Sequence, residues 1–186
     1  MAHIQLPTED PGIIGLLRYR PETAGPLTDL ANVLLRSDSS LSRGERELIA
    51  AHVSGLNECN FCAGSHGAFA AAQLEGGWDV VDAVDADLST APVSAKMRGL
   101  LAIAASVQAG GKSVTSAQVE AARAAGATDV EIHDTVLIAA AFCMYNRYVD
   151  GLGTWAPPDR EMYTQMAGAI VEHGYSAALQ DSEPPA

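Results

Sequence analysis

Apolar residues recur along this chain at the three- and four-residue spacing of an amphipathic α-helix. The expected helices span about residues 11–19, 27–34, 42–56, 59–73, 92–110, 115–126, 128–151 and 158–172. Sustained alternation of β-branched and polar residues, which strands require, is almost absent. The pattern therefore predicts an all-α fold.

Several helix starts are marked by their first residues. The Ser/Thr-x-x-Glu/Gln pattern of a capping box begins at Ser42, Thr115 and Thr128. Proline is favoured at the first helical position, so Pro92 predicts the start of another helix. The acidic stretch 79–87 between two of the expected helices is predicted to be a solvated connector.

Two of the expected helices are predicted to form an antiparallel hairpin. Only Asn57 and Glu58 separate the helix over 42–56 from the helix over 59–73. The second helix is rich in alanine and glycine, which lets two helices approach closely.

Length and charge limit the class of protein. The 186 residues fit a single domain, with an N-terminal helical arm over 1–40, a core over 41–153 and a C-terminal helix and tail over 154–186. The net charge of −12 and the scattered basic residues argue against nucleic-acid or anionic-membrane binding. No apolar run approaches the ~20 residues of a membrane span, and the first residues lack a signal-peptide pattern, so a cytoplasmic location is expected.

The chemistry is concentrated in a C-x-x-C pair, Cys59 and Cys62. In a reducing compartment such a pair is more often catalytic or metal-binding than structural. Exposed N–H groups and the dipole at a helix start favour the thiolate over the thiol. His66 follows Cys62 by one helical turn, so its imidazole could take the thiol proton.

Glu47 is predicted to meet His66 although the two are far apart in the sequence. If the hairpin turns near Asn57, they lie ~15 Å and ~13.5 Å from the turn along their helices, at one height. A carboxylate at that position would orient the imidazole and stabilise its protonated form. The predicted relay runs from Cys62 through His66 to Glu47.

Ordinary roles for the same residues remain alternatives. C-x-x-C-x3-H offers three zinc ligands where a closed structural site needs four, and no second pair follows. Glu47 alone would be a solvated first-turn carboxylate, and His66 alone a histidine bonded to a helix backbone. His52 lies on an apolar helix face and is expected to be packed in the core rather than catalytic.

The E-x11-C-x2-C-x3-H pattern that begins at Glu47, preceded by the segment 41–46, resembles the core motif of AhpD-like alkylhydroperoxidases in the carboxymuconolactone decarboxylase superfamily. The segment 128–153 is similar to a later helix of the uncharacterised peroxidase-related branch of that superfamily. The resemblance implies an AhpD-like all-α fold that assembles into a homotrimer or homohexamer. Its central antiparallel hairpin would carry the C-x-x-C pair.

For function, the resemblance implies a thiol-dependent peroxidase or disulfide reductase that acts on alkyl hydroperoxides or a partner disulfide. Cys62 would attack, Cys59 would resolve, and His66 and Glu47 would form the proton relay. No cofactor is expected beyond the redox-active disulfide, which an external dithiol from a lipoyl, thioredoxin-type or peroxiredoxin partner would reduce. One departure is Phe61, where well-studied members carry a second histidine. A cofactor-free decarboxylase or isomerase is the alternative, although decarboxylases proper lack the cysteine pair.

Overall fold

The computed structural model describes residues 2–176, and all the regular structure within them is helical. In chain order the elements are α1 (Gly12–Tyr19), α2 (Pro21–Arg36), α3 (Arg43–Leu56), α4 (Asn60–Ala71), α5 (Gly77–Ala86), α6 (Ala95–Ala109), the 3-10 turn η1 (Gly111–Ser113), α7 (Ser116–Ala124), α8 (Asp129–Gly151) and α9 (Arg160–His173). The prediction of an all-α fold is confirmed.

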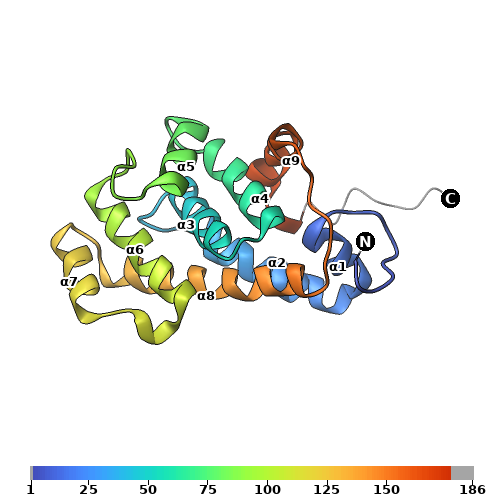
Figure 1. The fold of residues 1–186 in the computed structure, drawn as a ribbon, viewed down its shortest axis with the longest axis horizontal. Coiled ribbons are helices and arrows are strands. Elements are labelled where there is room, and N and C mark those ends of the chain that lie inside the picture. The colour runs from blue at the N-terminus through green and yellow to red at the C-terminus, as the bar shows by residue number, and fades with distance from the viewer. Residues whose placement is uncertain (1, 177–186) are drawn as a thin grey trace.

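The hairpin of α3 and α4 lies at the centre of the molecule (Figure 1). The long helix α8 runs beneath it and also contacts α6, while α5 and α9 pack against α4. Helices α6 and α7 lie at one end and α1 lies at the other, while α2 leads from α1 toward the middle, where it contacts α3 and α8. The two helices that carry the predicted chemistry are therefore surrounded by other helices.

Local sequence explains most of the helix starts. The capping boxes predicted at Ser42, Thr115 and Thr128 are all present. The prediction that Pro92 is the first residue of a helix is wrong, because α6 is capped by Ser94. The Ser94 hydroxyl accepts a hydrogen bond from the third helical amide at 3.1 Å, whereas proline only removes a donor.

The acidic stretch 79–87 is not a connector, because most of it forms α5. Trp78, Val81 and Val84 recur at helical spacing and pack against the rest of the protein, and Val84 is 3% exposed. The aspartates lie between these apolar positions, as the polar face of an amphipathic helix requires. Because aspartates are so frequent in this stretch, the apolar residues at helical spacing among them were not recognised as a helix pattern.

A buried ion pair joins the start of α8 to its surroundings. Glu131 is 2% exposed and accepts hydrogen bonds from Lys96 at 2.7 Å, from Ser40 at 2.9 Å and from Thr128. Burial raises the pKa of Glu131, but hydrogen bonds from Lys96, the Thr128 backbone and Ser40 outweigh it and lower that pKa to about 2. The charged carboxylate therefore links α8 to α6 and to the segment before α3.

The core consists of two clusters of buried side chains. The larger cluster joins α2, α3, α6 and α8. The smaller one lies mainly between α4 and α9, and it includes both cysteines of the C-x-x-C pair together with Phe61 and Tyr163. None of the helices described is both long and apolar enough to cross a membrane.

Candidate active site

Glu47 and His66 meet between α3 and α4. His66 Nδ1 lies 2.7 Å from Glu47 Oε2, and the two residues are 9% and 2% exposed. The similar distances of Glu47 and His66 from the hairpin turn predicted this meeting. A buried carboxylate needs hydrogen-bond partners, and His66 is one partner of Glu47. Because this bond uses Nδ1, it fixes the orientation of the imidazole ring and directs the other ring nitrogen, Nε2, away from the carboxylate.

Tyr175 adds a third member that the sequence analysis missed. Its hydroxyl donates to Glu47 Oε1 at 2.5 Å and lies 3.4 Å from His66 Nδ1. Burial, and then the neighbouring Glu47 carboxylate, hold the pKa of Tyr175 well above its usual range, so the hydroxyl keeps its proton. Glu47 therefore accepts a hydrogen bond at each of its two oxygens.

The segment after α9 places Tyr175 on this pair. Gly174 ends the helix with a φ of +84°, a conformation that favours glycine. The Tyr175 amide then donates to the Asn32 side chain at 3.0 Å. Arg36 donates to two carbonyls in the last turn of α9, at 2.8 and 3.1 Å. Two side chains of α2 thus hold the segment that carries Tyr175.

The two cysteines lie at the start of α4 and are both buried. Cys59 is the N-cap residue and Cys62 the third residue of the helix, and both are free thiols. The prediction that the helix start favours the thiolate is wrong for Cys62. A hydrogen bond with Cys59, together with burial, raises the pKa of Cys62 well above its ordinary value, and the Asn146 side chain opposes this only in part. Cys62 is therefore a thiol at rest and needs a base.

A network of amides fixes the hairpin turn beside the cysteines. The Asn57 side chain donates to Asn146 Oδ1 at 2.8 Å, and Asn146 donates to the Ser54 hydroxyl at 3.0 Å. Asn146 belongs to α8 and is 1% exposed. The partners of Asn146 lie far away in the sequence, so helix spacing alone could not predict these contacts. The sequence shows only that Asn146 is a polar residue on an otherwise apolar helix face.

A cavity of about 90 Å³ joins Cys62 to His66. Both residues line it, although the described residues contain no direct hydrogen bond between them. Its walls are almost entirely apolar, and they come from Ile13, Ile14, Leu17, Leu27, Thr28, Ala31, Phe61, Ser65, Phe69, Phe142, Tyr145, Met166, Ile170 and Tyr175. Helices α1 and α2 of the N-terminal arm therefore form one wall of the site.

Phe61 and Ser65 add two features to this cavity. Phe61 stands where well-studied members of the AhpD-like family have a second histidine. Its ring lies against Gly12 of α1, where an added Cβ would stand 2.1 Å from it, and its centroid is 6.2 Å from that of Tyr163. The Ser65 hydroxyl is buried and has no hydrogen-bond partner among the residues described. The cavity thus contains an unused hydroxyl and an additional apolar wall.

Within residues 2–176, no group of three or more His, Cys, Asp or Glu side chains is arranged to hold a metal ion. The nearest polar partners of His66 are Glu47 and Tyr175, not the two cysteines.

Fold and site together define an all-α protein with a buried thiol pair beside a carboxylate–imidazole–phenol group. The chain belongs to the carboxymuconolactone decarboxylase family, whose model matches residues 21–76 and 75–156.

Two solved structures share the AhpD-like fold. One is an alkylhydroperoxidase AhpD core, described as an uncharacterized peroxidase-related protein from Ralstonia eutropha JMP134, with 24% identity, a TM-score of 0.78 and coverage of 89% of this chain and 96% of that one. The other, an uncharacterized peroxidase-related protein from Silicibacter sp. TM1040, has 27% identity, a TM-score of 0.74 and coverage of 83% and 78%. No curated protein sequence matches the chain significantly.

Proposed function

We propose that this protein is a thiol-dependent peroxidase or disulfide reductase in which Cys62 is the attacking thiol and Cys59 the resolving thiol. The observation that carries the proposal is the buried Glu47–His66 pair, because it opens onto the same cavity as Cys62. Family membership and the peroxidase-related names of two structural neighbours support it. Tyr175 joins the predicted relay as a third group.

The reaction begins with deprotonation of Cys62. The imidazole nitrogen of His66 that is not bound to Glu47 takes the thiol proton, directly or through one water molecule. The thiolate attacks the outer peroxide oxygen, so that an S–O bond forms and the O–O bond breaks. The departing alkoxide takes the proton from the imidazolium, giving an alcohol and a sulfenic acid on Cys62.

Resolution and reduction complete the cycle. The Cys59 sulfur attacks the Cys62 sulfenic acid, an S–S bond forms, and the hydroxyl group leaves as water with the Cys59 proton. An external dithiol then supplies two electrons, restores both thiols and becomes a disulfide itself. A lipoyl, thioredoxin-type or peroxiredoxin partner would fill this role.

The cavity favours small and uncharged peroxides. Its volume of about 90 Å³ and its apolar walls would make a charged carboxylate costly to bury. The unpartnered Ser65 hydroxyl offers one hydrogen bond to a peroxide oxygen. Short alkyl hydroperoxides are therefore the proposed substrates.

Titration of free thiols tests the proposal directly. One equivalent of an alkyl hydroperoxide should consume two thiols per chain, with the metal content of the same sample unchanged. Cys62→Ser should abolish peroxide consumption, whereas Cys59→Ser should leave an untrapped sulfenate or a mixed disulfide. Full turnover by Cys62→Ser would reject the mechanism. A lactone decarboxylase or isomerase would keep its activity when both cysteines become serine.

Self-association is also part of the proposal. Val130, Leu137 and Met144 recur every seven residues along α8 and are 64%, 40% and 45% exposed. A second copy of the chain could cover this apolar stripe. Analytical ultracentrifugation should give a trimer or hexamer, and a purely monomeric protein at micromolar concentration would contradict this part of the proposal.

A further inference from the structure

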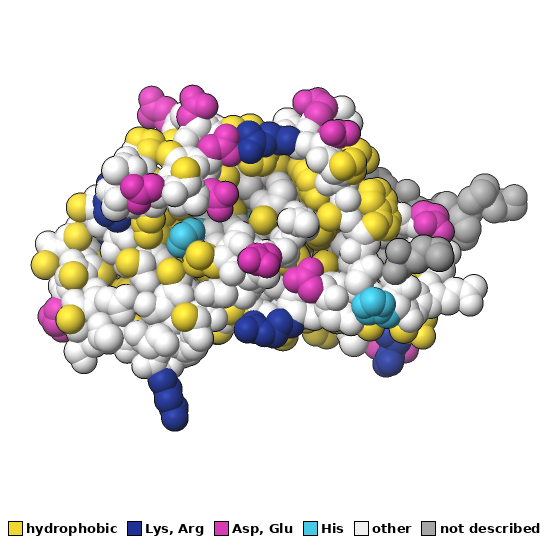
Figure 2. Space-filling view, in the orientation of Figure 1, with side chains coloured by type: hydrophobic (Ala, Val, Ile, Leu, Met, Phe, Trp, Pro, Cys, Tyr) yellow, Lys and Arg dark blue, Asp and Glu magenta, His cyan; other side chains and the backbone are white. Residues whose placement is uncertain are grey.

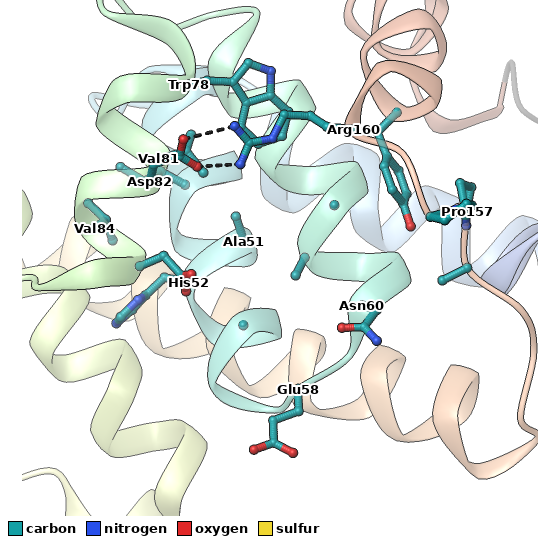
Figure 3. Close-up of a pocket in the computed structure, with 18 residues that line it drawn as sticks. Ala51, His52, Glu58, Asn60, Trp78, Val81, Asp82, Val84, Pro157 and Arg160 are labelled. Atoms are coloured by element: carbon teal, nitrogen blue, oxygen red, sulfur yellow. Dashed lines mark hydrogen bonds and ion pairs between the residues drawn. The ribbon is translucent and has the colours of Figure 1, made fainter.

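A second hollow, of about 610 Å³, lies on the opposite side of α4 from the cavity. Small residues of α3 and α4 form its floor, and α5 and α9 form its walls. Figure 2 shows the depression on this face, with acidic side chains on its rim. Figure 3 shows Arg160 of α9 reaching across to Asp82 of α5, where they form an ion pair at 2.7 Å beside Trp78.

Tyr163 separates this hollow from the two cysteines. It lines the hollow, yet it is only 5% exposed and belongs to the same buried cluster as Cys59 and Cys62. Its ring lies so close to the α4 backbone that a Cβ on Gly64 would stand 2.7 Å from it. Glycine at position 64 is therefore what admits the tyrosine ring.

The hydroxyl of Tyr163 has no hydrogen-bond partner among the described residues. This is unusual, because a buried hydroxyl without a partner destabilises the folded state. Tyr145 and Tyr175, by contrast, both donate to an oxygen at 2.8 Å or less. Burial, with the two cysteines nearby, raises the pKa of Tyr163 to about 12, so the hydroxyl remains a donor at neutral pH.

Both cysteines are free thiols in the structure, and neither neutral sulfur accepts a hydrogen bond from this hydroxyl. The redox cycle would supply a stronger acceptor, because reduction of the disulfide leaves one of these sulfurs charged. Cys62 lines the cavity, whereas Cys59 is fully buried and does not. An incoming thiolate therefore attacks the Cys62 sulfur, and Cys59 leaves as a buried thiolate. That charge needs a donor, and the Cys59 amide is already bonded to the Ser54 carbonyl at 3.0 Å.

We infer that Tyr163 donates a hydrogen bond to the Cys59 sulfur when the disulfide is reduced and that sulfur carries a negative charge. When the S–S bond breaks, its electron pair goes to Cys59, a new S–S bond joins Cys62 to the reductant, and Tyr163 keeps its proton. This inference rests on the proposed function, since it concerns the disulfide of the same site.

The test compares Tyr163→Phe with Tyr148→Phe in a Cys143→Ser background. Each variant loses one hydroxyl, but Tyr148 lines a different pocket and does not belong to the buried cluster of the two cysteines. Single-turnover reduction of the preformed disulfide by dithiothreitol should be about tenfold slower in Tyr163→Phe, the size expected for one hydrogen bond to a charged group. Tyr148→Phe should stay within twofold of its parent.

Two further measurements separate this role from a structural one. With Cys62→Ser added, Cys59 is the only cysteine, and Tyr163→Phe should reduce its ultraviolet thiolate absorbance at a given alkaline pH by up to tenfold. The reduced Tyr163→Phe protein should unfold at the same temperature as its parent or higher, because the lost hydroxyl had no partner.

A reduction rate and thiolate absorbance within twofold of the parent would overturn the inference, as would a slower rate accompanied by a lower unfolding temperature. Neither readout involves peroxide. If the wild-type protein consumes no hydroperoxide, the proposed function is rejected. If Tyr163→Phe still slows disulfide reduction and lowers the thiolate absorbance, this inference is supported all the same.

Discussion

The two sides of α4 each receive a tyrosine from the C-terminal part of the described chain, but only one of these hydroxyls has a partner. On the cavity side, Tyr175 donates to Glu47, which also binds His66. On the hollow side, Tyr163 has no partner among the described residues. The first side holds a carboxylate, an imidazole and a phenol that are already hydrogen-bonded to one another. In the proposed mechanism, the second side has a donor whose charged acceptor would form only during the reaction.

The largest expected effect lies on the cavity side. Glu47→Gln keeps the volume of a side chain that is 2% exposed but removes the charge that would stabilise the imidazolium. Peroxide consumption should fall about 100- to 1000-fold, as is typical when general acid–base catalysis is lost. Stopped-flow measurement of thiol oxidation would give the rate.

Glu58→Gln is the matched control for this substitution. Glu58 lies at the turn of the same hairpin and lines the hollow. The variant should react within twofold of wild type. Equal losses in the two variants would show that the cavity side has no special role.

The dependence of the rate on pH gives the next largest effect. Because a hydrogen bond with Cys59 and burial raise the pKa of Cys62, thiolate is scarce at neutral pH. The rate of thiol oxidation should rise steadily from neutral into alkaline pH. The protonated thiol also contributes stability below the ordinary thiol pKa, and this contribution is lost as pH rises through the folded value. A rate already constant at neutral pH would contradict the assignment of Cys62 as a thiol at rest.

Tyr175→Phe should have an intermediate effect. The phenylalanine ring can keep the packing on His66 and Phe69, but Glu47 loses one of its two hydrogen bonds. The rate of peroxide consumption should fall about tenfold, equivalent to about 1.4 kcal/mol. Tyr19 is exposed, so Tyr19→Phe is the control and should leave the rate of peroxide consumption unchanged. An unchanged rate in Tyr175→Phe would remove this tyrosine from the relay.

The smallest effect is expected at the ion pair that spans the hollow. The Asp82 and Arg160 side chains are 49% and 55% exposed, so solvent screens their attraction. Asp82→Asn should lower the free energy of unfolding by less than about 1 kcal/mol and leave thiol oxidation within twofold of wild type. Chemical denaturation followed by tryptophan fluorescence would measure the first quantity. A large loss of activity would mean that the hollow takes part in the peroxide step.

Local pattern and helix geometry were enough to predict the centre of the site. Glu47 and His66, nineteen residues apart, meet because each lies about the same number of residues from one tight turn. The three capping boxes could also be predicted, because each depends only on residues three positions apart in the sequence. The alignment of the two cysteines at one helix start followed from the same reasoning.

What the sequence could not predict depends on how distant helices pack. Tyr175 follows a helix end and has no periodic pattern of its own, and its position depends on Asn32 and Arg36 of α2. The raised pKa of Cys62 results from burial and from its contact with Cys59, and both overrule the helix dipole that was visible in the sequence. The motif therefore predicted which side chains come together, but not their electrostatic surroundings.

The clamp of Asn32 and Arg36 on the segment that carries Tyr175 also has a consequence for biosynthesis. A chain emerging from the ribosome would have made both cysteines, Glu47 and His66 long before residue 175. Its thiols would stay without the finished acid–base group until the last helix docked on the second. If the protein has the proposed function, newly made chains would gain their full reactivity only once α9 had docked on α2.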